Sequence, residues 1–130
     1  MASSYLGQIL IVGAGGFIGS SLRYVIGGAV QRLAMFTTFP LGTLVVNVMG
    51  CLLIGFLGGL AEIRGVLDPG QRLFLLIGVL GGFTTFSTFA FETFELAQDA
   101  EMMAAAINTL LQVLLGFGAA WLGYLGARFI

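Results

Sequence analysis

The sequence predicts an all-α membrane protein with four transmembrane helices, and two observations carry this prediction. Of the 130 residues, 58% are hydrophobic and only 8% are charged, whereas a soluble domain has about 25% charged residues. The apolar residues also form long blocks, and about 20 helical residues are needed to cross the hydrocarbon core of a bilayer. The blocks give four spans within one domain, residues 1–130, with predicted bounds Tyr5–Gly28, Pro40–Ala61, Arg72–Leu96 and Met103–Phe129.

The composition argues against several classes of function. The charged residues are five arginines and six acids, with a net charge of −1 and no lysine or histidine. Such a chain lacks the basic stripe that a nucleic-acid binder needs. A single cysteine, Cys51, supplies no ligand set for zinc, haem or an iron–sulfur cluster. Enzymatic activity has little support, because Ser87 as a nucleophile would have no histidine to activate it.

Small residues at a spacing of four recur in all four predicted spans. Lipid tails are as apolar as leucine, so burial does not drive helices together in a bilayer, and small residues let backbones approach closely instead. We therefore expect these positions to be helix contacts. They are Gly15, Gly19, Gly55, Gly59, Gly78, Gly82, Ala119, Gly123 and Ala127.

Polar side chains are rare inside the predicted spans. Asn47 lies in the second span, Glu92 near the end of the third, and Asn108 and Gln112 in the fourth. Because polar groups that face lipid are costly, such residues are expected to line the bundle interior or a water path. Structural hydrogen bonds between helices would also account for them, and an acid near a helix end could simply be interfacial. Both interpretations stay open here.

The third span contains a segment that disfavours a continuous helix near the bilayer midplane. Gly81 and Gly82 are poor helix formers, and Thr84 and Thr85 are β-branched with hydroxyls that compete for backbone partners. A break would expose backbone carbonyls at membrane depth, which is tolerated only where protein, water or an ion receives them. We favour a broken helix that forms an ion site. The alternative is an intact helix whose hydroxyls bond to its own carbonyls.

Two phenylalanines follow this segment. Phe86 and Phe89 are three residues apart, so both rings are expected on one helical face beside Thr85 and Thr88. An aromatic ring has a positive edge, which can meet an anion without a full charge that would hold it too tightly. Ordinary packing is the alternative role for these rings.

The arginines are divided almost evenly between the two sides of the predicted bundle. Four spans place Arg64, Arg72 and Arg128 on one side, and Arg32 on the other with Arg23 near the end of the first span. The imbalance of positive charge between short loops sets the orientation of a membrane protein. A difference of three arginines against two is too small to fix a single orientation. Insertion in both orientations, and an antiparallel dimer of opposed copies, are therefore physically plausible.

Three motifs, each in its own span, resemble those of the CrcB family, the Fluc-type fluoride channels. GGFIGSSLRY at 15–24 resembles the Gly-Gly-x-x-Gly-x-x-x-Arg motif of that family. GTLVVN at 42–47, followed by Gly50 and Cys51, resembles its Gly-Thr-Leu-x-Val-Asn stretch. GGFTTFSTF at 81–89, followed by Glu92, resembles its most specific motif. The resemblance covers nearly the whole chain.

The resemblance implies a fluoride-selective channel in the cell (inner) membrane, built as a dual-topology antiparallel homodimer with two pores. Uncharged HF crosses membranes and dissociates inside, and the channel would let the trapped fluoride leave passively down its gradient. The implied pathway residues are Phe86 and Phe89 as ring-edge ligands, Asn47 as an amide donor, Thr88 and Glu92 along a polar track, Arg23 at a vestibule, and Asn108 in the fourth span.

The same resemblance implies a central structural Na⁺, held by the backbone carbonyls of Gly81 and Thr84 from both subunits. The fourth span matches the family less closely. Members commonly carry a small hydroxyl residue deep in this span, where the present chain has Gln112 and then Gly116. Asn108 fits the family pattern better than Gln112 does.

Two other functions remain as alternatives. A proton-coupled four-helix transporter of similar size would use Glu92 as its titrating group, and it would move protons in a fixed ratio to its substrate. A non-transporting scaffold is the second alternative, but it would leave the midplane break and Asn47 without a purpose.

Overall fold

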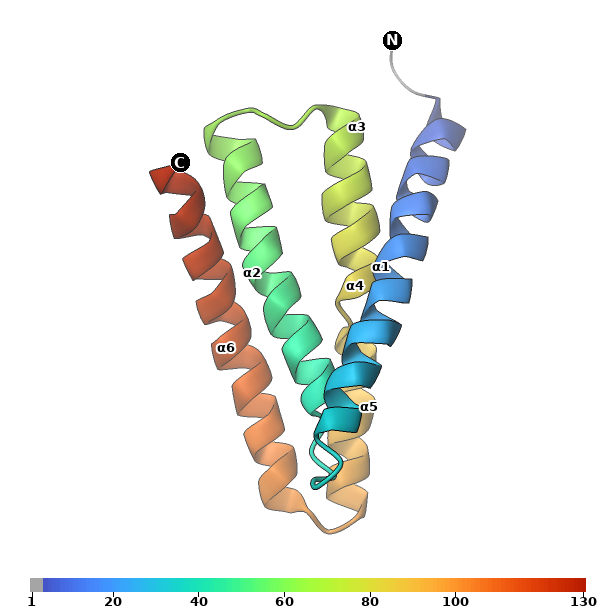
Figure 1. The fold of residues 1–130 in the computed structure, drawn as a ribbon, viewed down its shortest axis with the longest axis vertical. Helices are drawn as coiled ribbons and strands as arrows, with labels where there is room; N and C mark the ends of the chain where they lie inside the picture. The colour runs from blue at the N-terminus through green and yellow to red at the C-terminus, as the bar shows by residue number, and fades with distance from the viewer. Residues whose placement is uncertain (1–3) are drawn as a thin grey trace.

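The computed structural model describes residues 4–130, and the chain is helical apart from short connections (Figure 1). Within this described part, four stretches are long and apolar enough to cross a bilayer, which confirms the predicted all-α fold with four spans. The third span is composed of several consecutive elements. The elements are α1 (Tyr5–Leu33), α2 (Leu41–Ile63), α3 (Pro69–Arg72), η1 (Leu73–Leu80, with π-helical turns), α4 (Gly81–Phe83), α5 (Phe86–Gln98) and α6 (Met102–Phe129).

Helix α1 is longer than predicted, because it continues past Gly28 to Leu33. The polar residues at its end do not stop the helix. Gln31 accepts a hydrogen bond from the N–H of Gly42 at 3.0 Å and so ties the end of α1 to the start of α2. Arg32 lies in the last turn, where a cation interacts favourably with the helix dipole. The other three spans agree with their predicted bounds to within a few residues.

The start of α1 and the end of α6 lie at one end of the bundle, together with the connection between α2 and α3 (Figure 1). The connections between α1 and α2 and between α5 and α6 lie at the other end. The end of the bundle with the α2–α3 connection has three arginines at or near helix ends, namely Arg64, Arg72 and Arg128. Arg32 lies in the last turn of α1, at the opposite end. These four positions agree with the predicted division of the arginines, whereas Arg23, which was expected near the end of the first span, lies within the longer α1.

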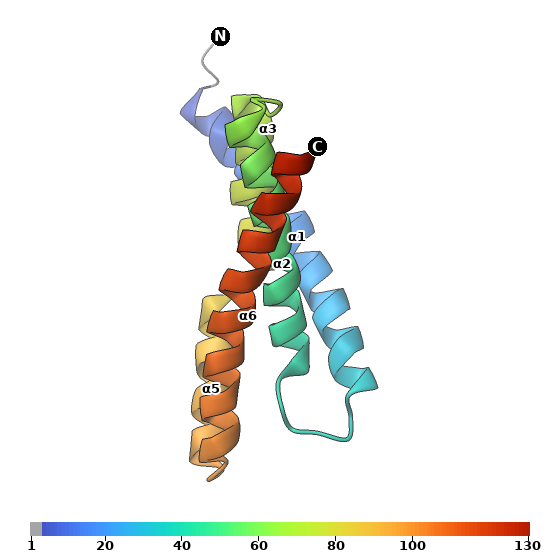
Figure 2. The same cartoon turned by 90° about the vertical axis from the view of Figure 1, so that its left-hand side faces the viewer.

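The helices pack closely in two groups, α1 with η1 and α4, and α2 with α6 (Figures 1 and 2). A Cβ atom on Gly15 would lie 2.9 Å from the Cα of Gly78, and one on Gly59 would lie 2.8 Å from the Cβ of Ala127. A Cβ on Gly123 would lie 2.8 Å from a backbone nitrogen of α2. These approaches leave no room for side chains, which confirms the prediction that these small residues are helix contacts.

The third span is interrupted at two residues. Thr84 and Thr85 have extended backbone, with ψ of 156° and 116°, and α5 begins at Phe86. The hydroxyl of Thr85 caps the new helix by accepting the N–H of Thr88 at 3.2 Å. The prediction of a broken third helix is thereby confirmed, and the intact helix is excluded.

The break begins just after the glycine pair. Gly81 and Gly82 remain helical, although glycine is a poor helix former. At Gly82 the missing side chain allows close packing, since a Cβ there would lie 2.6 Å from the carbonyl oxygen of Gly16. The two threonines therefore carry the interruption itself.

The lateral surface of the bundle is apolar. Large side chains such as Phe17, Phe117 and Trp121 are exposed on α1 and α6. In contrast, the largest fully buried side chains among the described residues are those of Val46 and Asn108. An apolar surface of this extent marks contact with lipid or protein, and the chain is a multi-pass membrane protein.

Candidate ion pathway

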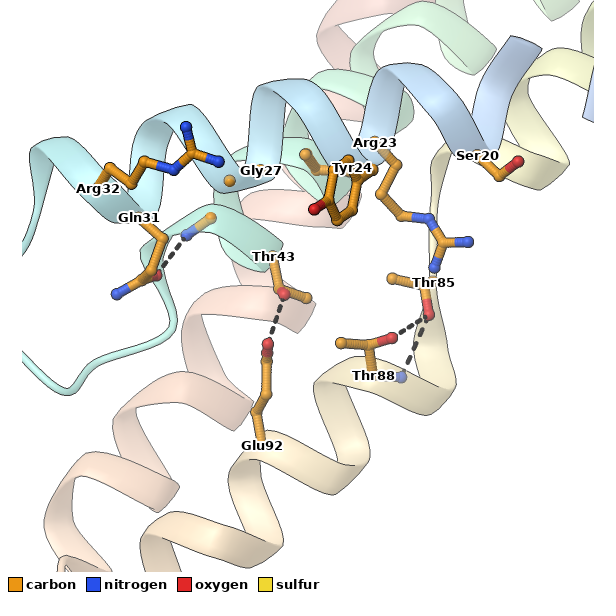
Figure 3. Close-up of a pocket in the computed structure, with 13 residues that line it drawn as sticks. Ser20, Arg23, Tyr24, Gly27, Gln31, Arg32, Thr43, Thr85, Thr88 and Glu92 are labelled. Carbon is orange, nitrogen blue, oxygen red and sulfur yellow. Dashed lines mark hydrogen bonds between the residues drawn. The ribbon is translucent and has the colours of Figure 1, made fainter. Parts of the chain in front are cut away.

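Two cavities lie on either side of the break in the third span. The first, here called the arginine cavity, has a volume of about 500 Å³ and lies between α1, α2 and α5 (Figure 3). The second, here called the ring cavity, has a volume of about 530 Å³ and lies between α2, the third span and α6. Thr85 lines both cavities. The two cavities therefore approach each other at the break.

The arginine cavity is polar and contains charges of both signs. Arg23 and Arg32 reach it from α1, and Glu92 reaches it from α5 (Figure 3). The hydroxyl of Thr43 donates to Oε1 of Glu92 at 2.8 Å, whereas the buried Oε2 atom has no hydrogen-bond partner among the described residues. The wall of this cavity therefore has two guanidinium groups and one carboxylate, whereas Glu95 and Asp99 line an adjoining cavity that shares Gln31 and Glu92 with it.

The ring cavity is mostly apolar and contains the two predicted phenylalanines. The ring centroids of Phe86 and Phe89 are 5.3 Å apart, with an interplanar angle of 78°. Both rings line the cavity, in agreement with the predicted shared face. Phe89 is buried, whereas Phe86 is 78% exposed on this single chain. The edge-to-face arrangement directs a positive ring edge of one residue at the face of the other.

Thr88 does not share the cavity of the rings. It lines the arginine cavity, whereas the sequence interpretation placed Thr88 beside Phe86 and Phe89 on one face. One residue of a helix turns by about 100°, so Thr88 projects from a neighbouring face of α5 rather than that of Phe89. Its hydroxyl accepts a hydrogen bond from the Thr85 hydroxyl at 2.9 Å. A hydrogen bond between two hydroxyls thus joins Thr88 to Thr85, a residue of the break.

Asn47 holds the broken backbone from α2. Its Oδ1 accepts the N–H of Thr85 at 2.8 Å, and its Nδ2 donates to the carbonyl of the same residue at 3.0 Å. The second N–H of Nδ2 goes to Oε1 of Gln112 on α6 at 3.0 Å. Asn47 therefore lies in the ring cavity, as a pathway residue would, but donates both N–H groups within the protein.

The two amide side chains of α6, those of Asn108 and Gln112, lie at different levels. Asn108 is fully buried, and its Nδ2 donates to the hydroxyl of Thr93 on α5 at 2.9 Å. It lines neither the arginine cavity nor the ring cavity. Gln112, one turn further along α6, lines the ring cavity instead. The structure thus brings Gln112, and not Asn108, to the break, and a pathway role for Asn108 stays a prediction.

Thr43 and Gln112 are site residues to which the sequence interpretation gave no pathway role. A signal for Thr43 was available, because it precedes Asn47 by four residues and so shares its helical face. Gln112 stood out as a polar residue in an apolar span. However, its level relative to the break depends on how α6 is shifted against α2, and the sequence alone does not give that shift.

The carbonyls of Gly81 and Thr84 lack the N–H partners that they would have in a continuous helix. The N–H of Thr85, which would bond to Gly81, bonds to Asn47 instead, and the N–H of Thr88, which would bond to Thr84, bonds to the Thr85 hydroxyl. Gly81 is also exposed on this chain. Carbonyl oxygens are suitable ligands for a hard cation. The described residues contain no group of three His, Cys, Asp or Glu side chains that could hold a metal.

The fold and these cavities define a class, namely a small four-helix membrane protein with polar groups gathered at a broken span. Comparison with known proteins gives the family. Residues 10–124 match the family described as "CrcB-like protein, Camphor Resistance (CrcB)", and the chain belongs to this family.

Curated relatives carry a common name. A protein of Methanosarcina barkeri named "Fluoride-specific ion channel FluC 3" is 45% identical over 115 residues, which are 88% of this chain and 86% of the relative. A "Fluoride-specific ion channel FluC" of Nitratidesulfovibrio vulgaris is 47% identical over 116 residues, covering 89% and 93%. One of Elusimicrobium minutum is 42% identical over 125 residues, covering 96% and 97%.

Proposed function

We propose that this protein is a fluoride-selective ion channel and not an enzyme. The observation that carries the proposal is the meeting of two cavities at a broken span, lined by arginines, hydroxyls, amides and aromatic rings. The names of the relatives support the same function, because each is called a fluoride-specific ion channel. As a single four-helix domain, the chain would form one subunit of the channel.

The lining suits a small anion that must lose its water. Selective conduction requires groups that replace the hydration shell, yet bind weakly enough for release. In the arginine cavity, Arg23 would draw anions toward the break, and the hydroxyls of Thr85 and Thr88 lie beyond it. In the ring cavity, Phe86 and Phe89 offer positive ring edges without a full charge.

The functional unit is proposed to be an antiparallel homodimer. Phe86 is 78% exposed and Gly81 is exposed at the level of the break, and bare backbone at membrane depth has to be covered by protein, water or an ion. A second copy would cover both. The nearly even division of the arginines supports insertion in both orientations, and opposed copies would then meet at their breaks.

The break is proposed to hold a structural Na⁺ between the two copies. The Gly81 and Thr84 carbonyls of each subunit would supply four oxygens in the dimer, and the described residues fit this role because both carbonyls lack their helical partners. The ion would supply a fixed positive charge at the dimer axis. Assembly that proceeds equally well after refolding in choline or potassium salts would contradict this site.

The direction of transport is proposed to be passive export across the cell's inner membrane. HF enters uncharged and dissociates at neutral pH, so fluoride accumulates inside and leaves down its electrochemical gradient. The proposal needs no coupled proton, in contrast to a transporter in which Glu92 titrates.

The test is halide efflux from liposomes that contain the purified protein. Fast, electrogenic release of fluoride with negligible release of chloride is expected. Equal release of both halides, or release of neither, would overturn the proposed function. Proton movement in a fixed ratio to fluoride would instead favour the coupled transporter. A reporter fused to the C-terminus tests the orientation, and a signal from only one side of the membrane would contradict the antiparallel dimer.

A further inference from the structure

Gln112 has an amide nitrogen that no other described residue of this chain uses. Its Nε2 atom is buried and has no hydrogen-bond acceptor among the described residues, while its Oε1 accepts from Asn47. A buried donor without an acceptor is costly, and natural structures rarely leave one. We propose that Gln112 donates an N–H directly to the transported anion in the ring cavity, and that Asn47 is the residue that orients it. This inference rests on the proposed function.

The orientation of both amides follows from the break. The extended Thr85 presents a backbone donor and a backbone acceptor to one side chain, so the oxygen of Asn47 must face the N–H and its nitrogen must face the carbonyl. The remaining N–H of Asn47 needs an acceptor, which Gln112 supplies with its oxygen at 3.0 Å. The NH₂ group of Gln112 is therefore turned away from Asn47. Neither amide can be flipped without losing hydrogen bonds.

The surroundings of Gln112 fit an anion. Gln112 lines the ring cavity together with Phe86 and Phe89, so an amide donor and two rings with positive edges share one space. The group is neutral, and a neutral donor can dehydrate an anion without trapping it as a fixed cation would. The nearby Asn47 donates both of its N–H groups to protein acceptors, which leaves Gln112 as the amide that can face the ion.

The experiment measures fluoride efflux from liposomes for variants at this position. Gln112→Met keeps much of the volume but removes both donors, and Gln112→Glu replaces them with acceptors. Each variant is expected to lower fluoride flux by about tenfold or more, the loss of one hydrogen bond to a charged group. The matched control is Thr109→Val on the same helix, because that exposed hydroxyl bonds only to the carbonyl of Ala105 in its own helix. The control should keep wild-type flux.

A double variant tests whether Asn47 acts through Gln112. If it does, Asn47→Leu combined with Gln112→Met should lower the flux about as much as Asn47→Leu alone, because the loss of Asn47 already removes the orientation of Gln112. Independent roles would instead multiply the two losses. Multiplied losses would remove the orienting role of Asn47.

A spectroscopic measurement on the wild-type protein does not depend on whether a variant folds. The side-chain ¹⁵N–¹H signals of Gln112, identified by their absence in Gln112→Glu or Gln112→Met, should shift on addition of sodium fluoride and stay in place with sodium chloride. If the chemical shifts of these signals do not change with fluoride, or if Gln112→Met keeps wild-type flux, the inference is overturned while the proposed function stands. Absence of fluoride flux in the wild-type protein would overturn both.

Discussion

Replacing Asn47 with leucine should lower the free energy of unfolding by more than the loss of a single hydrogen bond would. The change preserves approximate volume but removes three hydrogen bonds, two to the backbone of Thr85 and one to Gln112. In membrane proteins such bonds contribute about 0.6 kcal/mol on average and up to about 1.7 kcal/mol each. The expected loss in free energy of unfolding is therefore about 2 to 5 kcal/mol.

Reversible unfolding of the reconstituted protein in mixed micelles, at a fixed protein concentration, measures this loss. Thr109→Val provides the control, because its hydroxyl bonds only within α6, and its effect should stay below about 0.5 kcal/mol. A loss for Asn47→Leu that is no larger than that of the control would refute the assignment of Asn47 as the side chain that holds the break. It would also imply that Thr85 finds other partners for its backbone.

Helix packing, ring chemistry and charge each give a further expected outcome. Gly123→Ala should lower the free energy of unfolding by about 1 to 3 kcal/mol through overpacking, because its Cβ would lie 2.8 Å from a backbone nitrogen of α2. Gly118→Ala has nothing within 4 Å of its new Cβ and should be neutral or stabilising, so equal losses would contradict this packing. Phe86→Ile and Phe89→Ile should each lower fluoride flux by about tenfold with the oligomer intact by size-exclusion chromatography; wild-type flux in both would remove the ring-edge mechanism. Arg23→Gln should lower flux most at low ionic strength, because salt screens its attraction for anions; a loss of the same size at all salt concentrations would show that Arg23 acts otherwise.

The fold was largely predictable because a bilayer leaves a chain few choices. Blocks of apolar residues have to form helices that satisfy their own backbone, and the glycines at spacings of four mark where those helices touch. Even the break could be placed to within one turn from Gly81, Gly82 and the threonines that follow. The end of α1 was missed because Gln31 looks like a loop residue, whereas its side chain bonds to Gly42 across the connection.

The candidate site was less predictable, because it depends on how far one helix is shifted along another. Asn47 stood out as a polar residue, but its partner is the main chain of Thr85, and no pattern of residue types records a backbone partner. Similarly, Asn108 and Gln112 are one turn apart on α6, and the sequence does not say which of them reaches the level of the break. The packing of α2 against α6 determines which of the two residues lies level with the break.

The position of Thr85 in the wall of both cavities has an electrical consequence. A membrane voltage falls mainly across the part of a path that conducts least, and Thr85 is the residue that the walls of the two cavities share. An elementary charge that crosses 100 mV changes its energy by about 2.3 kcal/mol. In the proposed channel, most of that energy would act on an ion as it passes Thr85, so that one short step would govern the current instead of the full thickness of the bilayer.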